Sequence, residues 1–180
     1  MVTNNKATGS GGALQTIPNC YIDIPKLGKI ELNILPGISD SKNVNFANEN
    51  IMGRATPMVS YAHSEPRIIV LDLHFLVTKQ GDAQKNLLNL RKIQSLAYPR
   101  EGQDGVPYLP PPICKIRCGE ILSKTELCVI MKSYSIKFPE DVAWDRDTYL
   151  PVRFDINTSW DVIYVSNNLP NSDRIVKLGS

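Results

Sequence analysis

The two histidines of this sequence have side chains with the widest chemical range. His63 precedes Glu65 by two residues, so a carboxylate could hold it as a general base. His74 follows Asp72 by two residues, which places both on one face of a strand and could orient the imidazole or begin a metal site. No third ligand follows His74. We therefore favour ordinary surface hydrogen bonding for His63 and a packing or surface role for His74.

Cysteines are the next candidates for chemistry, and the chain has four of them: Cys20, Cys114, Cys118 and Cys128. Cys114 and Cys118 stand four residues apart, but structural zinc is usually held by four nitrogen or sulfur ligands in two close pairs, and no second close pair is present. We interpret both as small buried apolar residues on one face of a strand, with a disulfide or a metal site as less favoured alternatives. Free thiols fit synthesis in a reducing cytoplasm.

A small acidic cluster surrounds a tryptophan late in the chain. Asp141, Asp145 and Asp147 lie around Trp144, but a calcium loop needs regular ligand spacing and a closing bidentate glutamate, which are absent. A turn with solvated carboxylates is therefore favoured. Trp144 among charged neighbours is typical of an interface anchor, and it would equally suit a cap on the end of a barrel. The sequence leaves both interpretations open.

Motifs of common enzymes are absent from the sequence. It contains neither a GxxxxGK[ST] phosphate loop nor a GxSxG nucleophile turn, and nothing places a Ser/His/Asp triad. We therefore expect no enzyme activity, no cofactor and no resident metal.

Charge and hydropathy argue against nucleic acid and membrane partners. The chain has 180 residues and a net charge of +2, and its densest basic set is Lys85, Arg91 and Lys92, which we interpret as the solvated face of a helix. The longest apolar stretch, 68–71, is far too short to cross a bilayer, and the polar start lacks the apolar region of a signal peptide. We expect no sequence-specific nucleic-acid binding and no membrane insertion.

These side chains must be positioned mainly by strands, because alternation of apolar and polar residues dominates the sequence. It predicts strands at 20–24, 29–35, 67–78, 113–118, 127–138 and 148–158. A short strand is expected near 44–46. Residues 51–66 indicate an extended loop or an edge strand limited by prolines. Pro151 indicates that the last strand lies at an edge or contains a bulge.

Some faces of these elements can also be assigned. The strand 67–78 places Ile69, Leu71, Leu73 and Phe75 on one side. The strand 127–138 presents a second apolar face, interrupted by Lys132, made of Cys128, Ile130, Tyr134, Ile136 and Phe138.

One helix is predicted to begin after Gly81, with Asp82 as N-cap, and to end before Pro99. Apolar residues at helical spacing form its buried face: Ala83, Leu87, Leu90, Ile93 and Ala97. Asn86, Asn89 and Lys92 should face away from the core. The order of strands, helix and strands disfavours a parallel doubly wound fold. We expect one mainly β domain over 17–165, an antiparallel β-barrel or sandwich with a flanking helix, between flexible arms at 1–16 and 166–180.

The stretch from about 51 to 163 resembles a known family. It contains, in order, a GRATP loop, DLHFLVT, LRKIQSLAYP, PPPICKIRCGE and MKSYSIKFPEDVAWDRDTYLPVRFDI. This pattern resembles the N-terminal domain of the LysM-containing adaptor proteins that join tube to baseplate in contractile phage tails and related injection systems. The resemblance implies a fold like that of the tail tube and no catalytic residues. Little chain follows Val165, so wall binding by a LysM module is not implied.

The resemblance also implies a function. It predicts a structural virion protein of the tail, made in the host cytoplasm, that assembles as a ring, expected to be a hexamer, and contacts tail-tube, hub and other baseplate proteins. The alternative is a standalone β-sandwich module that binds carbohydrate or peptide through exposed aromatic residues, and a hydrolase around His63 or His74 is the least favoured hypothesis. The interface candidates are Tyr61, Tyr108, Trp144 and Trp160.

Overall fold

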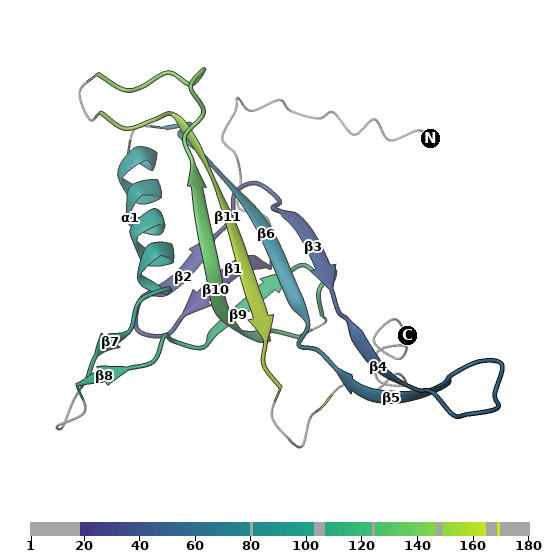
Figure 1. The fold of residues 1–180 in the computed structure, drawn as a ribbon. Helices are drawn as coiled ribbons and strands as arrows, with labels where there is room; N and C mark the ends of the chain where they lie inside the picture. The colour runs from purple at the N-terminus through teal and green to yellow at the C-terminus, as the bar shows by residue number, and fades with distance from the viewer. Residues whose placement is uncertain are drawn as a thin grey trace, which may run out of the picture.

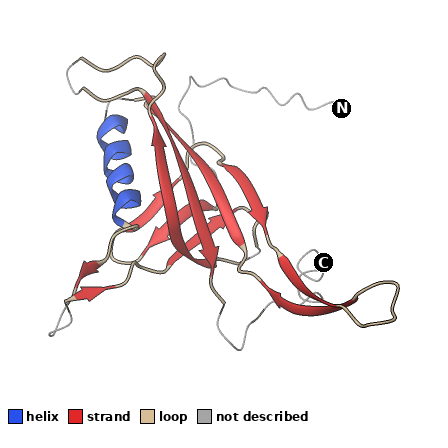
Figure 2. Ribbon diagram, in the orientation of Figure 1, coloured by secondary structure: helices blue, strands red, loops and turns tan. Residues whose placement is uncertain are grey.

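The structure is a computed structural model that describes residues 19–79, 81–102, 107–123, 125–146, 149–164 and 169. The predicted arm 1–16 lies outside the described residues, as does the predicted arm 166–180 apart from Leu169. Strands dominate the described chain, and one helix accompanies them (Figure 2). The mainly β fold with one main helix is therefore confirmed.

The elements follow one another in the order that the alternation predicts, with additional short strands. In chain order they are β1 (Cys20–Ile24), β2 (Gly28–Glu31), β3 (Gly37–Ser41), β4 (Val44–Glu49), β5 (Met58–Ser64), β6 (Ile68–Leu76), α1 (Asp82–Ser95), β7 (Arg100–Glu101), β8 (Tyr108–Leu109), β9 (Cys114–Cys118), β10 (Leu127–Lys137) and β11 (Arg153–Val162).

Seven strands form one antiparallel sheet in the order β2-β1-β9-β10-β11-β6-β3. The strands β1, β2 and β9 cross behind β10 and β11 at a steep angle, so the sheet curls back over its own inner face (Figure 1). Of the two predicted forms, barrel or sandwich, a closed barrel is not formed, because β2 and β3 end the sheet and do not pair with each other in the described residues. The helix α1 lies beside the sheet (Figure 1) and packs against β6.

The core lies inside this curl and consists of alternate residues from the strands. Ile69, Leu71, Leu73 and Phe75 of β6 are buried as the alternation predicts. They lie beside the inward residues of the neighbouring strand β11, and Phe75 stacks on Phe154 of that strand with ring centroids 5.1 Å apart. The burial of apolar surface on this face is the main favourable contribution to folding.

The helix α1 buries Leu90 and Ile93 and is followed by buried Leu96. The expectation that Asn86 and Asn89 face away is wrong, since both are buried. Asn86 lies there because its side-chain amide donates to the carbonyl of Leu76 at 3.2 Å, which ties the helix to the end of β6. A polar residue can therefore occupy the buried face at little cost. No helix among the described residues is long and apolar enough to cross a membrane.

Asp82 does not cap the helix in the predicted manner. The N-cap residue is Gly81, whose φ of 95° is readily adopted by glycine, and no side chain makes a cap hydrogen bond. The carboxylate of Asp82 instead accepts hydrogen bonds from the hydroxyl of Thr78 at 2.8 Å and from the backbone N–H of Lys79 at 2.9 Å. These bonds hold the β6–α1 turn in place. They also lower the pKa of Asp82, with the hydrogen bond from the Thr78 side chain as the largest cause.

The predicted face of β10 is wrong at its beginning. Cys128 is exposed, while Val129 and Met131 are buried. The register with β11 shifts between Met131 and Ser133, which is a β-bulge at Lys132. The extra residue turns the strand over, so that Tyr134 and Ile136 then pack against the core as predicted.

The last strand is central, contrary to the expectation of an edge position. β11 pairs with β10 on one side and with β6 on the other. Pro151 is compatible with this position because it lies just before the strand, where it forms an isolated bridge with Trp144.

Candidate assembly surface

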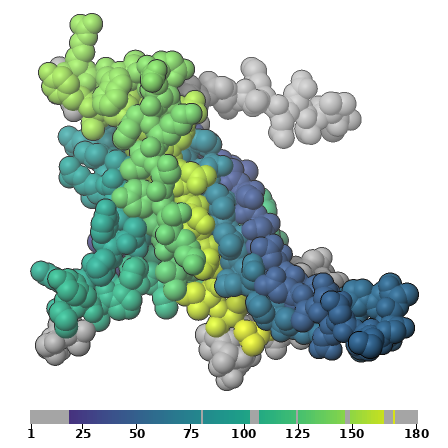
Figure 3. Space-filling model, in the orientation of Figure 1, coloured from purple at the N-terminus to yellow at the C-terminus, as the bar shows by residue number. Residues whose placement is uncertain are grey.

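A β-hairpin made of β4 and β5 extends beyond the main sheet. From here on, 'the arm' means this hairpin, residues 44–64, and not the terminal segments. β3 and β6 pair within the sheet, and β4 and β5 continue from them as a separate two-stranded sheet. The arm leaves the body at the end opposite to the β10–β11 connection (Figure 1) and stands clear of it in the space-filling view (Figure 3). The sequence indicated an extended loop or edge strand over much of this segment, and the structure makes it a projecting hairpin.

Polar side chains fix the root of the arm. Asn43 and Asn45 donate to the two carboxylate oxygens of Glu65 at 2.9 and 3.0 Å. These hydrogen bonds, that from Asn43 first, lower the pKa of Glu65. Next to them, the guanidinium of Arg67 donates to Asp40 through Nε at 2.8 Å. These hydrogen bonds therefore tie the two chain segments together at the base of the arm.

The arm exposes apolar side chains that no other described part of the chain covers. Phe46, Val59 and Tyr61 have exposed fractions of 58%, 60% and 63%, and the register and alternation place them on one face. The rings of Phe46 and Tyr61 lie edge to face with centroids 6.2 Å apart. At the tip, Met52 is fully exposed. A contiguous apolar surface on a projecting element is typical of a protein–protein contact.

An apolar hollow lies at the other end of the molecule. It has a volume of about 440 Å³ including its open mouth, and its walls come from α1, the β10–β11 connection and the start of β11. Trp144 is 53% exposed and lies 6.2 Å from Phe138 between ring centroids. The lining residues are Ala83, Leu87, Leu90, Phe138, Trp144, Tyr149, Leu150, Pro151 and Phe154. Trp144 thus forms part of the rim of an open apolar surface.

The candidate for acid–base chemistry is His74, and the structure gives it a partner other than Asp72. Its Nδ1 lies 2.6 Å from Oδ1 of Asp155 on the neighbouring strand β11, while Asp72 accepts a hydrogen bond from Asn157. Arg153 also donates to Asp155 at 3.2 Å. This network ties β6 to β11 on the outer face of the sheet, where it has the character of a cross-strand ion pair.

The Asp155 network predicts an acid-dependent loss of stability. Burial raises the pKa of Asp155, but the hydrogen bonds from His74 and Arg153 outweigh it, so the pKa lies below its ordinary value of 3.8. The carboxylate therefore stabilises the fold above that pH, and its contribution disappears as pH falls through the lowered pKa. We expect Asp155→Asn to reduce the urea midpoint at about pH 7 more than at about pH 2. An equal difference at both pH values would contradict this assignment.

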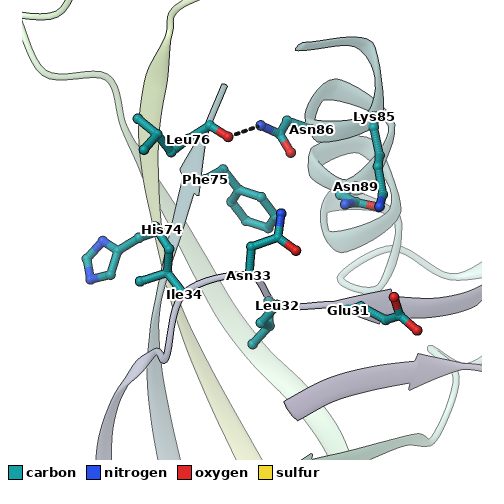
Figure 4. A pocket seen from close by; sticks show the side chains of 10 residues that line it. All are labelled: Glu31, Leu32, Asn33, Ile34, His74, Phe75, Leu76, Lys85, Asn86 and Asn89. Carbon is teal, nitrogen blue, oxygen red and sulfur yellow. Dashed lines mark hydrogen bonds between the residues drawn. The ribbon is translucent and has the colours of Figure 1, made fainter. Parts of the chain in front are cut away.

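A narrow polar gap lies between α1 and the loop after β2. In Figure 4 the amides of Asn86 and Asn89 face this gap from the helix, and Phe75 and Asn33 lie beside it. The ring of His74 points away from the gap (Figure 4), toward its partner Asp155. The hydrogen bond from Asn86 to Leu76 ties α1 to β6 at one side of the gap, so we assign the gap a structural role.

The structure separates the four predicted interface aromatics. Tyr61 is in the arm, Tyr108 is 70% exposed in the β7–β8 hairpin, and Trp144 is at the hollow. They form no common patch, contrary to the concave surface that the binding-module hypothesis predicts. Trp160 was expected on the surface, and this is wrong: it is completely buried, because it continues the inward alternation of β11 between Met131 and Ile69.

The other candidate residues make ordinary contacts or are simply buried. His63 lies in the arm, 3.1 Å from the amide of Asn45, a surface hydrogen bond of the kind expected. Cys114 and Cys118 are buried on one face of β9, as predicted. Asp147 lies outside the described residues. Among the described residues no group of three His, Cys, Asp or Glu side chains could hold a metal ion.

The arm and the hollow were not predicted as surfaces. A signal for the arm was present, because between Val44 and Ser64 the only charged residues apart from His63 are Glu49 and Arg54. A hairpin this poor in charge would normally be buried. The hollow has no comparable signal, since its walls come from three separate segments.

Comparison with known proteins adds little to this description. No family model matches the sequence, and no curated protein matches it. One solved structure that matches is a chain of an extracellular contractile injection system, the PVC sheath-tube complex in its extended state, with a TM-score of 0.38 and 13% identity. The match covers 81% of this chain and 86% of that chain. A likeness at this TM-score carries no argument about family or function.

Proposed function

We propose that this protein is a structural subunit that assembles with copies of itself into a ring, as a tube-end or baseplate adaptor of a contractile tail. The observation that carries the assembly is the arm, a hairpin whose apolar face is exposed among the described residues. The assignment to a tail rests on the sequence resemblance of residues 51–163 to the tube-to-baseplate adaptors. Virion partners are then tail-tube, hub and baseplate proteins.

The arm and the hollow supply the two halves of one contact. Both are apolar and open. The elements that form them, β4 and β5 for the arm and α1 with the β10–β11 connection for the hollow, lie at opposite ends of the molecule (Figure 1). A contact between two different patches is heterologous, and it closes into a ring when the rotation between copies divides a full turn. We assign the hollow to the arm of a second copy, whose Phe46, Met52 or Tyr61 would enter it.

Electron microscopy and sedimentation of the purified full chain test the proposal. We expect rings of one copy number, a hexamer by the resemblance, whose population grows with protein concentration. A chain that stays monomeric at every concentration, alone and when mixed with tail-tube and baseplate proteins, would overturn the proposal.

Truncating Trp144 tests the hollow. We expect Trp144→Ser to weaken self-association about 30-fold, because a central aromatic anchor contributes about 2 kcal/mol or more to an interface. Ile113→Ser is the matched control, since Ile113 is also 53% exposed but does not line the hollow. Sedimentation equilibrium measures both variants. Equal effects of the two substitutions would remove the hollow from the contact.

The binding-module alternative has less support in the structure. Its predicted patch combines Tyr61, Tyr108, Trp144 and Trp160, whereas the first three lie on three different elements and Trp160 is buried. The hollow does gather Trp144 with other aromatic residues, and we assign it to the arm of a second copy. We also propose that the protein is not an enzyme. Turnover of a substrate by the purified chain that depends on His74 would contradict this.

A further inference from the structure

Two buried cysteines face each other across β1 and β9. In the antiparallel register Cys20 lies directly opposite Cys118. The backbone N–H of Gly119 donates to the carbonyl of Asn19 at 2.9 Å, just outside this pair. That bond makes Cys20 and Cys118 a non-hydrogen-bonded pair, the position at which opposite side chains approach most closely. Both side chains point into the core, with exposed fractions of 2% and 1%.

The two thiols interact with each other. A hydrogen bond from Cys118 lowers the pKa of Cys20, and donating that bond, together with burial, raises the pKa of Cys118. Cys20 is therefore the thiol that more readily becomes a thiolate, which is the attacking form in thiol–disulfide exchange.

Neither Cys114 nor Cys128 lies opposite another cysteine in the sheet. Cys114 and Cys118, the pair with the closest spacing in sequence, are four residues apart in one extended strand, which separates them by about 13 Å, too far for a disulfide. The thiol of Cys114 donates to the carbonyl of Pro112 at 3.7 Å, and burial raises its pKa to about 11. Cys128 is exposed in β10.

We propose that Cys20 and Cys118 form an intrachain cross-strand disulfide when a low-molecular-weight disulfide such as oxidised glutathione is present. The inference is independent of the proposed assembly. The site joins the first described strand of the sheet to the end of β9, just before the Gly119 turn. The chain would hold free thiols after synthesis under reducing conditions and become cross-linked after transfer to oxidising surroundings.

The chemistry balances with glutathione disulfide as the oxidant. The thiolate of Cys20 attacks one of its sulfurs, forms a mixed disulfide and releases one glutathione thiolate. That thiolate takes the proton of Cys118, whose sulfur then attacks the sulfur of Cys20 and expels the second glutathione. The two protein thiols lose two electrons and two protons in total, and the oxidant gains them as two glutathione thiols.

Non-reducing peptide mapping tests the pairing. The full chain is unfolded, refolded in a glutathione redox buffer so that burial does not limit access, and digested with trypsin. Cleavage after Lys115 and Arg117 separates Cys114 from Cys118, so the cross-linked peptides identify the partners. We expect one link between Cys20 and Cys118, two fewer titratable thiols, and a rise of about 5–15 °C in Tm that dithiothreitol reverses.

Serine variants distinguish this pair from the other cysteines. Cys20→Ser and Cys118→Ser should each abolish the link and the rise in Tm, whereas Cys128→Ser should retain both. Four free thiols after oxidation, a link through Cys114 or Cys128, or a link that leaves Tm unchanged would each overturn the proposal.

Discussion

Shortening the arm should abolish ring assembly while leaving the fold intact. The variant replaces residues 46–62 with Asn-Gly, which joins the paired residues Asn45 and His63 through a two-residue hairpin turn and removes Phe46, Val59 and Tyr61. We expect a monomer in sedimentation and no rings in electron micrographs. The Tm should change by no more than about 2 °C, because the removed side chains lie outside the core.

Two point variants provide the matched comparison. Tyr61→Ser removes an exposed ring from the arm, and Tyr108→Ser removes an equally exposed ring from the β7–β8 hairpin. We expect the first to weaken assembly and the second to leave it unchanged. If the shortened chain still forms rings with wild-type affinity, the arm is not the contact and the proposed function loses its main support.

Prediction from the sequence was most accurate for strands in which apolar and polar residues alternate regularly and one face is buried in the core. In β6 every second residue from Ile69 to Phe75 is apolar, and all four are buried. A period of two fixes which side chains point inward, so both the element and its inner face could be predicted. The same argument placed Cys114 and Cys118 on one buried face of β9.

Errors arose where a local feature changes that period or satisfies a polar group. The bulge at Lys132 reverses the inward face of β10, and a bulge depends on pairing with β11 that the strand's own sequence does not contain. Asn86 is buried because the carbonyl of Leu76 happens to lie within reach. Long-range contacts of this kind cannot be predicted from periodicity within one segment.

The candidate surfaces were harder to predict than the core. Tyr61 and Trp144 were interface candidates and both are exposed, although the sequence left Trp144 open between an interface anchor and a cap on the end of a barrel. Their separate places at the arm and the hollow depend on how the sheet curls, which no single segment encodes. His74 and Asp155 are 81 residues apart in sequence, so their pairing became visible only with the β6–β11 register.

Trp160 should be the most costly aromatic residue to truncate. Its indole N–H donates to the hydroxyl of Thr158 at 2.8 Å, and that hydroxyl donates to the carbonyl of Leu71 at 3.1 Å. Trp160→Ala removes a fully buried ring from the centre of the sheet, so we expect a loss of about 3–5 kcal/mol in the free energy of unfolding. Urea denaturation followed by circular dichroism measures it.

Two further variants separate the contributions of packing and hydrogen bonding at this position. Trp160→Phe keeps most of the apolar volume but removes the hydrogen bond to Thr158. It should therefore lower the free energy of unfolding, but by less than Trp160→Ala does. Trp144→Ala should cost less than about 1 kcal/mol, because that ring is half exposed. The interface hypothesis for Trp160 makes the reverse prediction, in which Trp160→Ala impairs assembly but spares stability. Since a side chain at the centre of three paired strands cannot reach a neighbouring subunit without unfolding them, we expect stability to respond first and assembly only through it.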